Sequence, residues 1–355
     1  MPRLIDDAFG RIQHILLTIP DFAVDEFAPA LQSVIRALPA HANIDVLAGP
    51  AHDAAVNDWV RTYPNIRVHR CRQDLDHSHW AQDAVGGATN ADRPVLFWSK
   101  RFARHDDARA GAHLAALAGY PLHAIDAPYD GGNVLVQGDL ILAGADLGPP
   151  EDLDPTRRMI VIGTQEPCPP EAQVPTKLLP KGWQEIRRSG VEAGSQQPLF
   201  HLDLFLAPAG LGANGRPRWL VGCPRLGAAA LGIALLDHAG AEAFDEIAEV
   251  LRRNGCDVVR NPQPLVWSDQ PTAKLRTWFH LPVNNVLVEI RADRSTVWLP
   301  CFQSETWPEL AAIDAANAVI WQDLGFSVVK VPDCMALAER RGAVRCMCNV
   351  VSRAG

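Results

Sequence analysis

The stretch GGNVLVQGDLILAGA (131–145) decides the fold that this sequence predicts. It has a polar head followed by two apolar runs around a turn, which is the pattern of a β-hairpin. The same phrase recurs in HLDLFLAPAGLGANGRPRWLVG (201–222) and in NNVLVEIRADRSTVWLP (284–300). A repeat at intervals of about 70 to 80 residues indicates tandem structural units.

Each unit reads as strand, strand, helix, strand. The second and third hairpins lead into predicted helices at 239–254 and 307–323 and then into strands at 257–259 and 326–331. Five such units around an axis would form a pentein-type α/β propeller of five pseudo-repeated ββαβ units, with the polar heads at its centre. No linker divides the chain, so a single α/β domain over 1–355 is expected. Another unit is predicted at 94–128 and an eroded one at 12–71.

The composition excludes several classes of protein. Hydrophobic residues make up 48% and charged residues 21% of the 355, which is typical of an ordered globular chain. The net charge of −8 comes without a long basic run, so a nucleic-acid partner is not expected. No stretch reaches the roughly 18 apolar residues of a membrane span, so no membrane partner is expected either. The eight scattered cysteines and the absence of an export signal predict reduced thiols and a cytoplasmic protein.

Polar residues cluster at the heads of the repeated units and in one loop near the C-terminus. If the heads meet, they bring a cysteine, a histidine and several carboxylates together, which defines a site for covalent catalysis on a cation. A guanidinium ion is planar with paired N–H donors, so two carboxylates can hold it from different sides. The candidates are Asp83 of HWAQD (79–83), Asp130 of DGGN (130–133), His201 and Asp203 of HLD (201–203), Asn284, Asn285, and Cys346 of RRGAVRCMCNV (340–350).

The chemistry assigns each residue a role. His201 and Asp203 are expected on one face of a strand, because side chains alternate with a period of two. Asp203 and Asp83 would then hold the guanidinium beside an acid/base. The guanidinium carbon is a poor electrophile, so its attack needs a thiolate, and the substrate cation could favour thiolate formation at Cys346. His201 would protonate the departing ammonia and later activate the water that hydrolyses a thiouronium intermediate, leaving a ureido group.

Each motif also has a plain structural interpretation. An isolated H-x-D, or a cysteine near a C-terminus, is more often a packing element than a catalytic one. DGGN can be a tight turn in which glycine tolerates a positive φ, or Asp130 can contact the substrate. Asn284 and Asn285 are interpreted as residues that begin a strand, and the tryptophans as packing residues. No third ligand joins His77 and His79 with metal-site spacing, so neither a metal nor a cofactor is expected.

Over about 80–353 the chain resembles the guanidino-group-modifying superfamily of pentein fold, and most closely the catalytic domain of protein-arginine deiminases. WAQD (80–83) is similar to the family's W-x-Q-D, HLD (201–203) to its H-x-D, and GAVRCMCNV (342–350) to its G-x-V-x-C-x-x-N-V. The anchors occur in the expected order. The resemblance implies that Asp83 and Asp203 bind the guanidinium, that His201 is the general acid/base and that Cys346 is the nucleophile.

Two departures from the family pattern carry further expectations. Arg345 stands where the family commonly has a histidine, so it is expected either to contact the substrate and alter substrate preference or to favour the thiolate electrostatically. The animal enzymes bind calcium with acidic residues directly after W-x-Q-D. Here Ala84, Val85 and Gly86 offer no side-chain ligand, so the activity is expected to be independent of calcium.

The sequence therefore predicts a deiminase that converts the guanidino group of an arginine-like substrate to a ureido group plus ammonia. The substrate can be a small guanidine or a peptidyl arginine, and the oligomeric state stays open. An amidinotransferase would use the same cysteine and pass the amidino group to an amine. A non-catalytic binder of cationic ligands is the third possibility, and the intact set of four residues argues against it.

Overall fold

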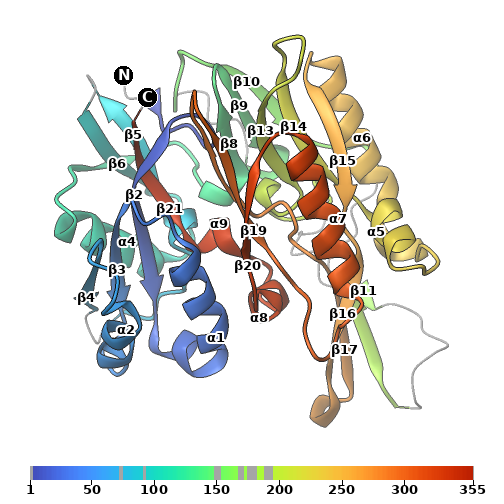
Figure 1. Cartoon of the computed structure of the whole chain (residues 1–355), viewed down its shortest axis with the longest axis horizontal. Coiled ribbons are helices and arrows are strands. Elements are labelled where there is room, and N and C mark those ends of the chain that lie inside the picture. The colour runs from blue at the N-terminus through green and yellow to red at the C-terminus, as the bar shows by residue number, and fades with distance from the viewer. Residues whose placement is uncertain are drawn as a thin grey trace.

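A computed structural model describes residues 3–71, 75–90, 93–147, 153–166, 172–173, 182–187 and 195–354. It has the predicted α/β architecture, with helices packed on the outer faces of several small sheets (Figure 1). Among the helices of the described ranges, none is both long enough and apolar enough to cross a membrane.

The three predicted hairpins form three sheets with one common pairing pattern. In each, the first strand is antiparallel to the second, and the second is parallel to the third. The strands are β8 (Val134–Gln137), β9 (Leu140–Gly144) and β10 (Arg158–Ile162); β13 (Leu206–Leu211), β14 (Pro217–Cys223) and β15 (Asp257–Pro262); and β18 (Leu287–Ile290), β19 (Ser295–Pro300) and β20 (Ser327–Val331).

Two further sheets have the same pattern. One contains β5 (Val85–Asn90), β6 (Arg93–Ser99) and β7 (Leu122–Ile125), with β1 (Arg3–Leu4) added at its edge. The other contains the parallel strands β2 (Arg11–Ile19), β3 (Asn43–Ala48) and β4 (Ile66–Arg70). Its antiparallel partner is β21 (Asn349–Ala354), the last strand of the chain (Figure 1). The unit that looked eroded in the sequence is therefore completed by the C-terminus.

Four sheets have a helix between their second and third strands. Apolar residues at helical spacing form the buried face of each of these helices, as Phe244, Ile247 and Leu251 do. The β8–β9–β10 sheet departs from the predicted unit, because the described residues between β9 and β10 contain only a 3₁₀ turn, η2 (Ala145–Leu147). The helices are α1 (Asp21–Ala37), α4 (His105–Leu117), α6 (Ala241–Arg253) and α7 (Leu310–Asp323), with the shorter α2 (Asp53–Val60), α5 (Pro224–Ala230), α8 (Met335–Glu339) and η4 (Asp237–Ala239).

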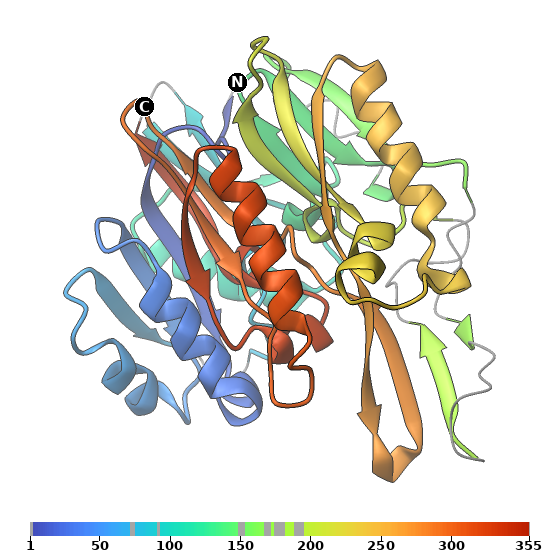
Figure 2. The ribbon, with the colours of Figure 1, turned by 45° about the vertical axis from the view of Figure 1, so that its right-hand side comes forward.

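A sixth sheet has no counterpart in the predicted repeat. It pairs β11 (Ala172–Gln173), β12 (Gln184–Arg187), β17 (Leu275–His280) and β16 (Leu265–Gln270), and β16 and β17 are joined by the turn η5 (Pro271–Ala273). Figure 2 shows its long hairpin extending away from the body of the protein.

Short helical turns precede the first strands of four of the five like sheets. They are α3 (Ala81–Ala84) before β5, η1 (Gly131–Asn133) before β8, η3 (Leu202–Leu204) before β13 and α9 (Val344–Met347) before β21. These turns lie against one another, with α3 beside both α9 and η1, and η1 beside η3. The polar heads of the sequence repeat therefore meet at one place.

Candidate active site

The four turns place four predicted residues around one cavity of about 320 Å³. Asp83 belongs to α3, Asp130 caps η1, His201 directly precedes η3, and Cys346 lies in α9. Asp203 and Arg345 do not line the cavity and lie behind it. The full lining is Trp80, Asp83, Arg104, Asp130, Phe200, His201, Arg340, Arg341 and Cys346.

The two glycines of DGGN allow the turns to come this close. A Cβ atom on Gly131 would lie 1.9 Å from the carbonyl oxygen of Gln82, and one on Gly132 would lie 2.2 Å from Nδ1 of His201. Neither glycine has a positive φ. The prediction that DGGN is a tight turn is confirmed. The predicted reason for its glycines is wrong, because they are required by the close approach of α3 and His201 and not by a left-handed backbone.

His201 and Asp130 form an ion pair in which the imidazole is buried and the carboxylate is partly exposed, with Nε2 of the imidazole 3.0 Å from Oδ2 of the carboxylate. Burial lowers the pKa of His201, but the charges of Asp130 and Asp83 outweigh burial and raise this pKa to about 9. Burial raises the pKa of Asp130, and His201 and Arg104 outweigh that effect and lower it. The imidazole is therefore protonated at neutral pH and can act as an acid.

The prediction that HLD is a strand is wrong. His201 has extended backbone, but Leu202–Leu204 form the 3₁₀ turn η3. Alternation with a period of two therefore does not apply, and the side chains of His201 and Asp203 have different partners. The two residues still meet the same catalytic region, because η3 turns tightly beside η1.

Asp83 has one occupied and one unoccupied oxygen. Its Oδ2 accepts a hydrogen bond from Arg104, whose Nη1 donates to Ser78 Oγ at 3.2 Å and lies 3.0 Å from Asp107. Its Oδ1 is buried and accepts no hydrogen bond, and Nδ1 of His201 lies 4.0 Å from it. Burial, followed by the charge of Asp130, raises the pKa of Asp83 to about 7. No motif in the sequence pointed to Arg104, which precedes α4 and reaches the site only through the fold.

Asp203 has the same arrangement. Its Oδ2 accepts from Nη1 of Arg345 at 2.8 Å and lies 3.5 Å from Sγ of Cys346, whereas its buried Oδ1 has no hydrogen-bond partner. Burial raises the pKa of Asp203, and the Arg345 charge opposes that rise. Each of the two carboxylates predicted to bind a guanidinium is thus held by a resident arginine at one oxygen and leaves the other as an acceptor.

The Arg345 side chain is buried among protein acceptors. Besides Asp203, it donates to Asp7 at 2.9 Å and to the carbonyl oxygens of Gly131 at 3.0 Å and Val134 at 3.2 Å. It therefore links the N-terminal segment, η1, η3 and α9. Of its two expected roles, direct substrate contact does not agree with this position, because Arg345 does not line the cavity and its guanidinium donates to protein acceptors.

Cys346 is held by Asn285, which the sequence had suggested only begins a strand. Asn285 Nδ2 donates to Sγ of Cys346 at 3.0 Å, and its Oδ1 accepts from the backbone N–H groups of Cys346 and Ala343, both at 3.0 Å. Burial, then Asp203 and Asp83, raise the pKa of the Cys346 thiol well above its ordinary value. The nearby Cys348 is fully buried in the apolar core and does not line the cavity.

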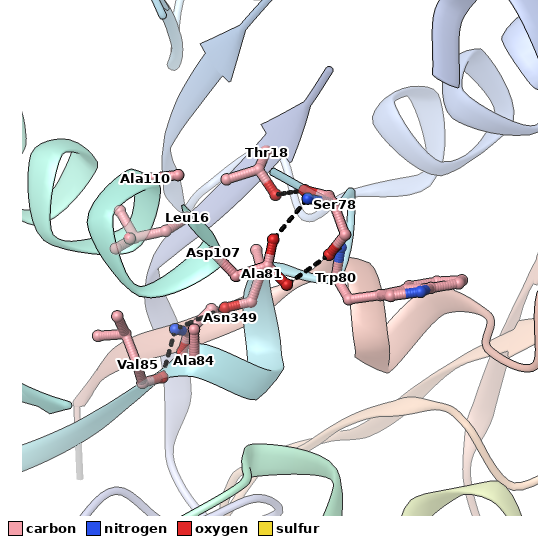
Figure 3. Close-up of a pocket in the computed structure, with 11 residues that line it drawn as sticks. Leu16, Thr18, Ser78, Trp80, Ala81, Ala84, Val85, Asp107, Ala110 and Asn349 are labelled. Atoms are coloured by element: carbon pink, nitrogen blue, oxygen red, sulfur yellow. Dashed lines mark hydrogen bonds between the residues drawn. The ribbon is translucent and has the colours of Figure 1, made fainter. Parts of the chain in front are cut away.

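The wall behind α3 is closed. Figure 3 shows Thr18 and Asp107 bound to Ser78, and Asn349 bound to the backbone around α3, while the Trp80 side chain points away from this network. The space in this wall amounts to about 10 Å³, enough for at most a single water molecule. The network therefore orients Asp83 and binds no ligand. Trp80, expected only to pack, also lines the cavity.

Asp83, Asp130 and His201 are also a candidate cation site. Ligand atoms of these three residues lie within 4.8 Å of one another. A metal ion requires a neutral imidazole, however, and the raised pKa of His201 means that a proton would have to be displaced. The guanidinium of Arg104 adds a competing charge beside Asp83. The residues present fit an organic cation better than a metal ion.

No protein-family model matches the chain, and no curated protein sequence matches it either. Solved structures do match. An agmatine deiminase from C. jejuni is 12% identical with a TM-score of 0.65, covering 100% of this chain and 98% of the other. An agmatine deiminase of Enterococcus faecalis is 11% identical with a TM-score of 0.63, covering 99% and 96%. A protein provisionally described as a peptidyl-arginine deiminase is 14% identical with a TM-score of 0.60, covering 99% of each chain.

These likenesses confirm the predicted resemblance at the level of the fold. The chain has the α/β fold of the pentein deiminases along essentially its whole length. Both the agmatine type and the peptidyl-arginine type are among the similar structures, at similar scores. The fold therefore does not distinguish between their substrates.

Proposed function

We propose that this chain is a deiminase, a hydrolase that converts the guanidino group of an arginine-like substrate to a ureido group and ammonia. The observation that carries the proposal is that Cys346, His201 and Asp83 line one cavity, with the orphaned oxygens of Asp83 and Asp203 beside them. The fold shared with known deiminases supports it. In the same proposal, the five like sheets are the five units of a pentein propeller, whose centre is this cavity.

The substrate guanidinium supplies the donor that Asp83 lacks. A buried carboxylate oxygen without a partner is costly, and an N–H group of a planar cation in the cavity satisfies it. Asp203 lies behind Cys346 and acts on the cation through its negative charge. Arg104 and Arg345 hold one oxygen of each carboxylate in place. The resident arginines therefore act as positioning residues, and the substrate completes the network.

Substrate binding also prepares the nucleophile. The Cys346 thiol is protonated in the free protein, because burial and two carboxylates disfavour the thiolate. A guanidinium bound beside it offsets the charge of those carboxylates and lowers the pKa of the thiol, which then releases its proton to water. Asn285 donates to the sulfur and stabilises the thiolate that forms.

The reaction then follows in two steps. Cys346 Sγ forms a bond to the guanidinium carbon, and His201 donates its proton to one amino group, which leaves as ammonia and leaves an amidino-cysteine. Neutral His201 next takes a proton from water, which attacks the same carbon. The C–S bond breaks, the thiolate leaves, and a ureido product remains.

An amidinotransferase would also begin with attack of Cys346 on the guanidinium carbon, but the alkyl amine of the substrate would leave in place of ammonia. The amidino group left on the sulfur would then pass to an acceptor amine. The decisive experiment incubates the protein with arginine, agmatine, methylated arginines and arginine-containing peptides, and measures ammonia and ureido product. Cys346→Ala is the inactive control and Cys348→Ala its matched active control. Activity that survives Cys346→Ala sinks the mechanism, and product that appears only with an added amine establishes the transferase.

A further inference from the structure

Two further arginines line the cavity. The charge of Arg104 is matched by Asp83 and Asp107, and that of His201 by Asp130. Arg340 and Arg341 line the same cavity without any role at the reacting end. Two guanidinium groups in this wall offer paired N–H donors to an anionic group of a ligand whose cation lies at Cys346.

The loop that bears these arginines is firmly placed against the cavity wall. A Cβ atom on Gly342 would lie 2.6 Å from the Trp80 ring, so the loop rests directly on that ring. The guanidinium carbon of Arg341 lies 5.2 Å from the centre of the Phe200 ring, and the centre of that ring lies 4.2 Å from the centre of the His201 ring. Phe200 thus connects the acid/base and Arg341 in one continuous wall.

The backbone at Arg341 is unusual. Its φ of 66° lies in the left-handed region, which favours glycine and disfavours a side chain as large as that of arginine. This conformation ends helix α8, because the Arg341 N–H donates to the carbonyl oxygen of Ala338 and the Gly342 N–H donates to that of Leu337. The end of the helix therefore fixes where Arg341 meets the cavity.

Arg340 is available for exchange. It forms an ion pair with Glu26, and the side chains of the two residues are 55% and 44% exposed. Exposed pairs of this kind contribute little to stability and are readily replaced by a better partner. A carboxylate entering the cavity would be such a partner, because it can accept from both neighbouring guanidinium groups.

We propose that Arg340 and Arg341 form a subsite for a carboxylate at the far end of the guanidine, so that the substrate is a small, free guanidino acid of about the size of arginine. This inference rests on the proposed function, which places the guanidinium at Cys346. A distal amine, as in agmatine, gains nothing from this subsite and meets like charge there. The chain is therefore selective against the substrate named for two of the proteins that share its fold.

Three substrates test the subsite directly. Agmatine lacks only the carboxylate of arginine, and argininamide keeps the amino group but replaces the carboxylate with a neutral amide. We expect kcat/KM for arginine to exceed that for both by about ten- to a hundredfold, as charge-assisted hydrogen bonds allow. Arg341→Gln should remove this difference by lowering only the value for arginine, with a smaller loss in Arg340→Gln. Arg252→Gln, on the exposed face of α6, is the matched control.

Equal kcat/KM for the three substrates overturns the subsite and leaves the deiminase proposal intact. The same holds if Arg341→Gln lowers kcat/KM equally for all three substrates, or if arginine within a peptide is preferred to free arginine. Calorimetry with Cys346→Ala separates binding from turnover. Arginine that binds more tightly than agmatine, in a manner that depends on Arg341, supports the subsite even if no product forms. In that case the deiminase proposal fails alone.

Discussion

Arg345 and Asp203 form a buried ion pair directly behind Cys346, with Nη1 of the arginine 2.8 Å from Oδ2 of the carboxylate. The same oxygen lies 3.5 Å from Sγ of Cys346. The pair thus couples the position of the Asp203 carboxylate to the position of the sulfur. The other carboxylate oxygen is buried and accepts no hydrogen bond.

Loss of the Arg345 charge should destabilise the whole protein. Arg345→Met leaves Asp203 as an uncompensated buried charge, which costs about 3–5 kcal/mol of the free energy of unfolding. Arg345→Lys keeps the charge but cannot reach all four acceptors, so we expect a smaller loss and a reduced kcat. Urea unfolding and ammonia release measure both quantities. Asp7→Asn, which removes the more exposed partner, is the control, and a stable, fully active Arg345→Met would contradict this role.

The activity should have a bell-shaped pH dependence. Asp83 must be ionised to bind the guanidinium, and its pKa is raised to about 7, so kcat/KM should fall as the pH drops through about 7. His201 must be protonated to release ammonia, and its pKa is raised to about 9, so kcat/KM should fall above about 9.

The Arg104→Gln variant tests the assignment of the acidic limb. Arg104 lowers the pKa of Asp83, so its removal should move that limb to higher pH and leave the basic limb nearly in place. Profiles of kcat/KM for the wild type and for Arg252→Gln give the reference. If the acidic limb of the profile does not move in Arg104→Gln, that limb reports the ionisation of a group other than Asp83.

Asn285 should control the ionisation of Cys346. Asn285→Asp is nearly isosteric but replaces the donor at the sulfur with a negative charge, so it should raise the pKa of the thiol and lower kcat by about 100-fold. The rate of alkylation by iodoacetamide as a function of pH reports the thiol directly. An unchanged alkylation profile would show that the contact between Asn285 and the sulfur has no electrostatic effect.

The two neighbouring cysteines should differ sharply in reactivity. Cys346 lines the cavity, so arginine should protect it from alkylation, whereas Cys348 is enclosed in the apolar core and should not react in the folded protein. Cys348→Ala should cost about 1–2 kcal/mol of stability, because it leaves a small cavity, and it should retain activity. Mass spectrometry of the alkylated peptide identifies the modified residue. Modification of Cys348 ahead of Cys346 would reverse the assignment of the nucleophile.

The activity should not require calcium. The backbone after Asp83 passes into β5 with Ala84, Val85 and Gly86, none of which has a side-chain oxygen. Chelation with EGTA should therefore leave kcat/KM unchanged, and added calcium should not increase it. A loss of activity on chelation that calcium alone restores would refute this prediction.

Local patterns in the sequence were sufficient to predict the elements and several of the residues that line the cavity. Two apolar runs around a turn specify a hairpin almost independently of the rest of the chain, so the strands β8–β9, β13–β14 and β18–β19 could be predicted. Cys346, His201 and Asp83 could be identified because each stands in a motif with a chemical reason. The turn at HLD was predicted as a strand because three residues are too few to reveal a period.

Tertiary structure decided the rest, because long-range contacts leave no local signal. Arg104, Asn285 and Arg341 lie far from one another in the chain, and only the meeting of the turns brings them to one cavity. A buried carboxylate can bind a substrate only through an oxygen that does not already accept a hydrogen bond from another side chain of the protein. The sequence alone predicted that Asp83 and Asp203 would bind a cation. The fold determined that an arginine already occupies one oxygen of each, because burial demands a partner for charge and the packing of distant segments supplies it.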